Sequence, residues 1–353
     1  MNTIDLFSGA GGLSLGLKKA GAKILASVEK SRDAVATYAL HAETTCQIFN
    51  QDIRQIDFSI FKGKVDLVAG GPPCQPFSLG GLRKANKDQR DMIPEFIRCL
   101  SEVRPEAFIM ENVPGLISKK TRGYFDKTLD QLSKLNYRLN WSILNAADYG
   151  VPQKRRRLFI LGFKDGILRF PRPTHGTNTK QQHIKSFDVI GLEPLGEAPN
   201  CVVKFAKDPD LRPNPYAGQL YNGGGRPIDP HGPCHTILAS SGGHKTHWID
   251  TKGVAVEYFK HLQNGGKPWE GEVPGARRLS VEECSRIQTF PNGLVFQGMR
   301  SSQYTQVGDA VPVVLAQALA SSVFFQLASR NHADNQLLDP DVEVLHFQPT
   351  LAI

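Results

Sequence analysis

Residues 65–78 read VDLVAGGPPCQPFS, a short apolar run followed by a loop rich in glycine and proline. The run at 65–69 is typical of a strand buried on both faces, which predicts a parallel sheet in an α/β fold. Open α/β sheets bind their ligands at the carboxyl ends of their strands. Cys74 therefore stands where a positioned nucleophile is expected, because the flanking prolines stiffen its loop. An inert cysteine in an ordinary turn is the alternative.

The composition is that of a basic protein large enough to form two lobes. The chain has 353 residues, 40% of them hydrophobic, and its 42 Lys and Arg against 34 Asp and Glu give a net charge of +8. This surplus suits a polyanionic partner, although an ordinary basic enzyme can carry the same charge. The six cysteines form no C-x-x-C pair, and His244 and His247 lack partners at ligand spacing, so we expect no metal site.

The N-terminus predicts a soluble protein of the cytoplasm. Met1 leads directly into a strand pattern, without the charged and apolar regions of a secretory signal. The apolar runs fall short of the ~20 residues that span a bilayer. A chain of this kind is not expected to have a disulfide framework.

A unit of strand, glycine turn and helix opens the chain. Strand residues 3–7 lead into SGAGG at 8–12, an arrangement that lays a ligand against a helix N-terminus. Glu29 ends the next strand about 20 residues further on, where an acid can contact the hydroxyl groups of a ribose. The turn lacks the G-x-G-x-x-G pattern, which disfavours a nicotinamide cofactor. Asp52 follows another strand and could meet an adenine amino group or cap a helix.

Glu111 and two arginines are further candidates for chemistry. A strand at 107–110 ends in Glu111, at the same sheet edge as Cys74. Partial burial there raises the pKa of a carboxyl group and lets it carry a proton near neutrality, unless it only caps a helix or forms a salt bridge. Strand alternation sends Arg155 and Arg157 to one face, where they form a fork for carbonyl and phosphate oxygens or a solvated basic edge.

The chain divides into two predicted domains and a tail. Regular periodicity holds over residues 1–168 and returns over about 300–327, which predicts one α/β domain. Residues 169–299 predict a smaller, irregular, β-containing domain, with a capping box at Ser280 and Glu283. Within it, residues 170–275 are rich in Gly, Pro, His and Asn and lack helical periodicity. Residues 306–312, beyond this domain, are expected to form a turn. Residues 78–91 form a polar loop that could close over a site or lie on the surface. Residues 328–353 form a C-terminal tail.

Together and in this order, the motifs resemble those of DNA (cytosine-5) methyltransferases of the bacterial restriction–modification type. The likeness runs from Asp5 to about Leu319. It rests on DLFSGAGG at 5–12, PCQ at 73–75, ENV at 111–113, the Q-x-R-x-R segment at 153–157, and the segments 277–291 and 306–312. Two positions depart from the family: Asp309 stands where Asn is usual, and Lys30 stands where an apolar or aromatic residue is frequent.

The resemblance implies a fold and a reaction. The fold would be a Rossmann-like S-adenosylmethionine-dependent methyltransferase domain with a smaller target-recognition domain. Cys74 would add to C6 of a cytosine flipped out of duplex DNA, Glu111 would protonate N3, and Arg157 would bind O2. Arg155 would hold a phosphate or position its loop. The methyl group would pass to C5 and protect host DNA from a cognate restriction endonuclease.

The resemblance also implies the binding residues. The S-adenosylmethionine set would be Phe7, Ser8, Gly9, Gly11, Gly12, Leu13, Glu29, Lys30, Asp52, Ile53, Pro73, Asp309 and Ala310. The DNA set would be Gln75, Ser78, Arg226, His244 and Lys245. The last three lie in donor-rich loops that could read base edges or only touch phosphates. The partner would be double-stranded DNA, with no membrane and no metal, and a monomer is expected because the enzyme acts on one strand at a time.

Two other functions stay open at this point. An RNA cytosine methyltransferase could be built on the same scaffold, and activity on tRNA against DNA would separate the two. A catalytically silent module that only binds DNA or S-adenosylmethionine is disfavoured, because Cys74, Glu111 and Arg157 are all present.

Overall fold

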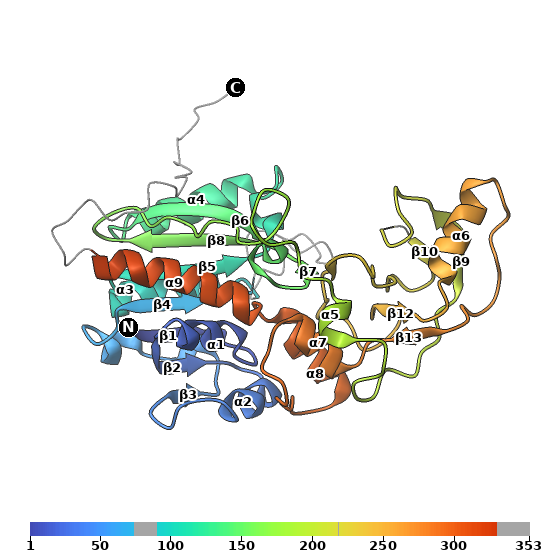
Figure 1. Ribbon diagram of the computed structural model, residues 1–353. Helices are drawn as coiled ribbons and strands as arrows, with labels where there is room; N and C mark the ends of the chain where they lie inside the picture. The colour runs from blue at the N-terminus through green and yellow to red at the C-terminus, as the bar shows by residue number, and fades with distance from the viewer. Residues whose placement is uncertain (74–89, 218, 330–353) are drawn as a thin grey trace. The chain divides into compact units, whose positions relative to one another are not determined.

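The structure is a computed structural model that describes residues 1–73, 90–217 and 219–329 (Figure 1). The chain forms two compact units. Among the described residues, the first consists of those within Met1–Asn145, Arg156–Pro173 and Val313–Ser329, and the second of those within Ala146–Arg155 and Thr174–Pro312. Residues 146–155 and 300–312 thus group with the second unit by their contacts. The assignment of a catalytic and a target-recognition domain stays a prediction.

A seven-stranded sheet forms the centre of the first unit. Its strands are β1 (Asn2–Leu6), β2 (Lys23–Val28), β3 (Gln47–Phe49), β4 (Leu67–Gly70), β5 (Ala107–Asn112), β6 (Arg138–Asn145) and β8 (Arg156–Phe163). Their order is β3-β2-β1-β4-β5-β8-β6. The first five in this order run parallel, and β8 runs antiparallel to both β5 and β6. This mixed sheet, with helices between its parallel strands, confirms the predicted Rossmann-like α/β fold.

The strand order reverses between β1 and β4. Leu6 pairs with Gly70 in the parallel register, so the turn after β1 and the loop after β4 leave the sheet side by side. Gly70 has no room for a side chain, because a Cβ there would overlap the backbone oxygen of Leu6. A reversal of this kind is the point at which open α/β sheets bind ligands.

Helices connect the strands of the first unit. They are α1 (Gly12–Lys19), α2 (Arg32–Ala39), α3 (Ile93–Val103), α4 (Arg122–Ser133) and α9 (Val313–Ser329), with the 3₁₀ turns η1 (Ile53–Gln55), η2 (Phe58–Phe61) and η4 (Pro114–Ile117). In Figure 1, α1 and α9 pack together on the side of the sheet that faces the viewer. Gly16 of α1 permits this approach, because a Cβ there would overlap the Cβ of Ala316.

The stretch Arg300–Ser329 is long and apolar enough, by length and composition alone, to cross a membrane. This differs from the expectation that the chain has no such run. The stretch consists of two helices, α8 (Arg300–Asp309) and α9, which belong to separate units. Leu315, Leu319 and Val323 of α9 are fully buried in the first unit. Because buried core helices pass the same test, we interpret α9 as a core helix.

The second unit is built from short strands and helices. The strand pairs are β7 (Gln153–Lys154) with β11 (Cys234–His235), β9 (Phe205–Asp210) with β10 (Gln219–Tyr221), and β12 (Trp248–Asp250) with β13 (Ala276–Arg278). The helical segments are η5 (Ala146–Tyr149), α5 (Phe187–Ile190), α6 (Val254–Gln263), α7 (Val281–Ile287) and α8. The irregular, β-containing character of this part is as predicted, and α7 starts at the predicted capping box of Ser280 and Glu283.

Two local expectations in the second unit are wrong. Residues 170–275 were expected to lack helical periodicity, but α6 lies among them and buries Tyr258 and Phe259 against Trp248 and its neighbours. Residues 306–312 were expected to form a turn, but α8 continues to Asp309. Both helices depend on packing within the unit, which outweighs the local signals from glycine and polar residues.

Candidate active site

The glycine turn after β1 has a backbone that few residues adopt. Phe7 has φ of 58° and Gly11, the N-cap of α1, has φ of 90°. A side chain at Gly11 would overlap the ring of His41, whose Nε2 lies 2.8 Å from the backbone oxygen of Ala10. The end of α2 therefore holds the turn. A strained non-glycine residue such as Phe7 is often found at a functional site.

A buried polar network lies beneath this turn. The hydroxyl group of Ser14 donates to Oδ2 of Asp5 at 2.6 Å and lies 2.8 Å from the hydroxyl group of Tyr38. The other carboxyl oxygen of Asp5 is buried and has no hydrogen-bond partner within the described residues. Burial raises the pKa of Asp5 to about 7. Sequence reasoning assigned Asp5 no role, although it stands two residues before Phe7 on the first predicted strand.

The groups around the turn fit an adenosyl ligand. Ser8 carries a buried hydroxyl oxygen without a hydrogen-bond partner in the described chain. Glu29, at the end of β2, accepts from the backbone N–H of Gly9 at 2.9 Å and of Ser31 at 2.7 Å. Each carboxylate oxygen can still accept from a ribose hydroxyl. The position of a Cβ at Gly9 has no neighbour within 4 Å, so this part of the turn is open.

Asp52 and Lys30, both predicted to contact the cofactor, contact each other. Lys30 Nζ lies 3.0 Å from Asp52 Oδ2, and Arg54 Nη2 lies 2.6 Å from the same oxygen. Asp52 also caps η1 by accepting from the backbone N–H of Arg54 at 3.1 Å. The hydrogen bond from Arg54 is the main reason that the pKa of Asp52 falls below its ordinary value. The capping alternative is therefore observed, and the contact with adenine stays a prediction.

Glu111 and Arg157 form a largely buried ion pair in the first unit. Glu111 lies opposite Phe159 in the antiparallel register of β5 and β8, so Arg157 is its diagonal neighbour on the same face. Arg157 Nε lies 2.9 Å from Glu111 Oε1. The salt-bridge alternative for Glu111 is thus observed. The pair lies at the end of β5, and the neighbouring strand β4 precedes the loop that contains Cys74 in the sequence. An acid role for Glu111 stays a prediction.

Residues next to this pair fix the loop that follows β4. A Cβ on Gly71 would stand 2.9 Å from Glu111 Oε2. Any residue other than glycine would therefore displace the carboxylate or the loop. Asn112 donates from Nδ2 to the backbone oxygen of Pro72 at 3.1 Å, and the N–H of Met92 donates to Pro73 at 3.1 Å. Pro73 is the last residue described before the gap. Cys74, Gln75 and Ser78 lie outside the described residues.

Arg155 does not form the predicted fork with Arg157. The expected single strand is interrupted at Arg155, between β7 and β8. The Arg155 side chain is fully buried in the second unit and donates to the backbone oxygens of Ile237 at 3.1 Å and Gly308 at 2.8 Å. Because its guanidinium is buried among carbonyl groups, it is not available to a phosphate. Of the two predicted roles, only that of positioning its loop is compatible with this geometry.

Asp309 and Ala310 end α8 in the second unit. Gln288 donates from Nε2 to the backbone oxygen of Ala310 at 3.2 Å, and Gln288 also accepts from Gln153 at 2.8 Å. Gln153 in turn accepts from the N–H of Ile237 at 2.7 Å. Gln153 and Arg155 of the Q-x-R-x-R segment thus form buried hydrogen bonds within the second unit. The predicted contact of Asp309 and Ala310 with the cofactor stays a prediction.

The predicted base-reading loops are joined to each other. The N–H of Gly225 donates to the backbone oxygen of His244 at 3.0 Å, and Arg278 donates to the same oxygen at 3.1 Å. Arg226 donates from its backbone to His247 Nδ1 at 3.1 Å. Burial lowers the pKa of His247 to about 4, so its ring is neutral at pH 7. Base contacts by Arg226, His244 and Lys245 stay predictions.

Comparison with known proteins decides the family. The sequence profile described as "C-5 cytosine-specific DNA methylase" matches residues 1–208 and 221–324. The chain belongs to this family. The methylase is also 33% identical to Type II methyltransferase M.AplI of Arthrospira platensis, over 96% of its own chain and 89% of the relative. It is 34% identical to Type II methyltransferase M1.HphI of Haemophilus parahaemolyticus, over 91% and 86% of the two chains.

Solved structures share the fold of this methylase. Methyltransferase EhMeth of Entamoeba histolytica superposes with a TM-score of 0.63 at 16% identity, covering 93% of this chain and 98% of that one. The Dnmt2 methyltransferase of S. pombe superposes with a TM-score of 0.61 at 18% identity, covering 93% and 99%. Family and relatives together confirm the predicted enzyme class, DNA (cytosine-5) methyltransferase of the restriction–modification type.

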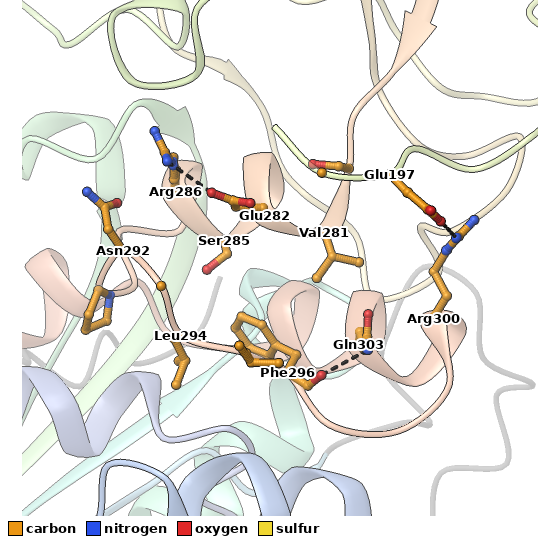
Figure 2. Close-up of a pocket in the computed structure, with 15 residues that line it drawn as sticks. Glu197, Val281, Glu282, Ser285, Arg286, Asn292, Leu294, Phe296, Arg300 and Gln303 are labelled. Carbon is orange, nitrogen blue, oxygen red and sulfur yellow. Dashed lines mark hydrogen bonds and ion pairs between the residues drawn. The ribbon is translucent and has the colours of Figure 1, made fainter. Parts of the chain in front are cut away.

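The methylase also has a hollow of about 390 Å³ within its second unit (Figure 2). It is lined by α7, the segment after it and the start of α8. Its charged side chains pair with one another, Glu282 with Arg286 and Glu197 with Arg300. None of the residues predicted for catalysis, cofactor or DNA lines it. Within the described ranges, the side chains also form no cluster of His, Cys, Asp or Glu that could hold a metal ion.

Sequence reasoning missed several polar side chains that bind the backbone of segments near the predicted site residues of this methylase. Asn112 could have been found from its place after Glu111, since alternation sends it to the opposite face of β5. Arg98 could have been found from Glu95 and Glu102, which lie at ion-pair spacing on the same helix. Arg278 had no comparable signal, because its backbone partners lie 32 to 77 residues away in the chain.

Proposed function

We propose that this methylase transfers a methyl group from S-adenosylmethionine to C5 of a cytosine that has been flipped out of duplex DNA. Membership of the C-5 cytosine-specific DNA methylase family supports this substrate. The names of the relatives, Type II methyltransferases, support a role in protecting host DNA from a cognate restriction endonuclease. We further propose that the enzyme acts as a monomer on the chromosome, in the cytoplasm.

The observation that carries the proposal is the Glu111–Arg157 ion pair, packed against Gly71 three residues before Cys74. The thiolate of Cys74 adds to C6 of the cytosine. The electrons of the C5–C6 double bond move into the ring, and Glu111 delivers a proton to N3. Arg157 binds the O2 carbonyl while it holds Glu111, since a guanidinium has donors for both.

The cofactor is assigned to the turn after β1 and the strand ends beside it. The residues that would hold it are Phe7, Ser8, Gly9, Gly11, Gly12, Leu13, Glu29, Lys30, Asp52, Ile53, Pro73, Asp309 and Ala310. When bound, S-adenosylmethionine supplies an electrophilic methyl group. The methyl group would pass to C5 and leave S-adenosylhomocysteine as the product. The C5 proton would then pass to water, and its electron pair would restore the C5–C6 double bond and expel the thiolate of Cys74, while N3 returns its proton to Glu111.

The target base must leave the helix before this chemistry can occur, which costs a few kcal/mol. We assign contacts with DNA to Gln75, Ser78, Arg226, His244 and Lys245. The net charge of +8 agrees with a polyanionic substrate. A partner of this kind implies that affinity falls steeply as salt rises.

The test is a covalent trap. Duplex DNA carrying 5-fluorocytosine at the target position cannot lose fluorine in place of the C5 proton, so a true adduct accumulates with Cys74. The expected result is a denaturation-resistant protein–DNA complex that depends on S-adenosylmethionine and disappears in Cys74→Ser. Sequencing of host DNA for 5-methylcytosine after expression supplies the target sequence. Normal methylation by Cys74→Ser would overturn the proposal.

A further inference from the structure

Arg98 binds the backbone of the segment that carries two of the proposed cofactor residues. It lies in the middle of α3, in the first unit. Its Nη2 donates to the backbone oxygen of Ile53 at 2.8 Å, and its Nη1 donates to that of Ile56 at 3.0 Å. Ile53 is the first residue of η1, the short turn that Asp52 caps, and Ile56 is the C-cap of the same turn.

Two acids on the same helix hold this guanidinium in place. Glu95 accepts from Arg98 Nε at 2.7 Å, and Glu102 accepts from Nη1 at 2.8 Å. The other oxygen of Glu102 accepts from the N–H of Phe58 at 2.9 Å, and the guanidinium lies 5.4 Å from the centre of the Phe58 ring. Residues 53–58 are therefore bound to α3 at several successive points.

The segment has few bonds of its own. A 3₁₀ turn of three residues has weak internal hydrogen-bond geometry. Its own bonds here run from Gln55 to Asp52 at 3.0 Å and from Ile56 to Ile53 at 3.2 Å. Its position against the sheet consequently depends on the buried side chains of Ile53, Ile56 and Phe58 and on the bonds from α3.

We propose that Arg98 is a positioning residue for the adenine end of the S-adenosylmethionine site. It acts through the backbone of Ile53 and Ile56 and does not touch the cofactor. This inference rests on the proposed function, which assigns Asp52 and Ile53 to the adenine. The planar fork of arginine can donate to two carbonyl groups at once, whereas a lysine ammonium is a single compact donor.

The experiment compares Arg98→Met and Arg98→Lys with a matched control, Arg122→Met. Arg122 also forms an i,i+4 ion pair on a helix of the first unit, with Asp126 at 2.9 Å, but is no part of the proposed site. The dissociation constants of S-adenosylmethionine and of adenosine are measured by calorimetry on the full chain, well below the melting temperature. Steady-state kinetics then separate KM for each substrate from kcat.

We expect Arg98→Met to raise the dissociation constant of S-adenosylmethionine about tenfold, because two charge-assisted bonds are lost. The dissociation constant of adenosine should rise by the same factor, since the substitution acts at the adenine end of the site. KM for DNA and kcat at saturating cofactor should stay within about twofold of wild type. Arg98→Lys should recover part of the affinity, and Arg122→Met should bind as wild type does.

Other results would overturn the inference. Unchanged cofactor affinity in Arg98→Met, or a loss of kcat with KM unaltered, contradicts a positioning role at the adenine end. If Arg98→Met does not fold, Arg98→Lys decides in its place, since wild-type affinity in that variant contradicts the need for the fork. Asp52→Ala and Ile53→Ala separate the two proposals. If they weaken binding and the Arg98 variants do not, only this inference fails; if the wild type binds no S-adenosylmethionine, the proposed function fails.

Discussion

Arg157 Nε lies 2.9 Å from Glu111 Oε1, and the two side chains are only 15% and 12% exposed. The antiparallel pairing of β5 and β8 produces this contact, because it makes the two residues diagonal neighbours on one face of the sheet. The pair lies at the end of β5, next to the strand that leads to Cys74. The positive charge of Arg157 and the proton donor Glu111 would thus both come from the paired strands β5 and β8.

Glu111→Gln keeps the shape of the side chain but removes its proton. We expect kcat to fall by about 10²- to 10⁴-fold, the usual contribution of a positioned acid. Single-turnover methyl transfer to duplex DNA measures this, and DNA binding by titration should stay near the wild-type value. A variant rate that equals the wild-type rate from about pH 6 to 9 would contradict the assigned role.

Asn112→Asp should slow formation of the Cys74 adduct. The substitution removes the amide group that donates to the Pro72 carbonyl at 3.1 Å. It places a carboxylate oxygen of the new side chain next to the carbonyl oxygen of Pro72. Asn140→Asp is the matched control, because Asn140 is a buried asparagine that donates to Leu168 at 2.9 Å, far along the chain from this loop. Each change should cost about 1–3 kcal/mol of stability. Equal adduct rates in the two variants would mean that Asn112 does not position the loop.

Gly71→Ala should impair catalysis through Glu111. The added methyl group would stand 2.9 Å from Glu111 Oε2 and must displace the carboxylate or the loop. Gly123→Ala is the control, since a Cβ there meets nothing within 4 Å and the residue lies in helix α4. That control should be neutral or stabilising by up to about 1 kcal/mol. The comparison is made by kcat and by the melting temperature of each variant.

The buried carboxyl group of Asp5 should make stability depend on pH. Its pKa is raised to about 7 by burial, whereas an ordinary Asp has a pKa of ~3.9. Between these values the folded state binds more protons than the unfolded state, so stability falls as pH rises from about 4 to 7. The stabilising contribution of the proton is complete below about pH 4 and is lost as pH rises through 7.

Asp5→Asn tests this, because the amide cannot titrate. The free energy of unfolding of the wild type should fall by about 2–4 kcal/mol relative to the variant between pH 4 and 7. Asp126→Asn, on the exposed surface of α4, should keep the wild-type slope. Parallel curves for the wild type and Asp5→Asn would show that Asp5 is ionised in both states.

Part of the site could be predicted because it depends on where strands end. The runs before Ser8, Gly71 and Glu111 are apolar and short, so their ends were identifiable, and parallel strands bring their carboxyl ends to one edge. The structure has the turns at Ser8 and Gly71 at the reversal of strand order between β1 and β4, and Glu111 at the end of the neighbouring β5. The alternation rule failed at Arg155, because it assumes an unbroken strand through residues 153–157.

The sequence by itself determined the α/β class, the edge of the sheet at which the site is expected, and the family resemblance. These follow from hydrophobic periodicity and short motifs, which act over a few residues. Only the tertiary structure decided the partners of the long polar side chains. Arg155 binds carbonyl groups 82 and 153 residues away, and Arg98 binds those of Ile53 and Ile56, 45 and 42 residues before it. A local pattern shows that such a side chain must satisfy its donors when buried, but not which distant backbone will accept them.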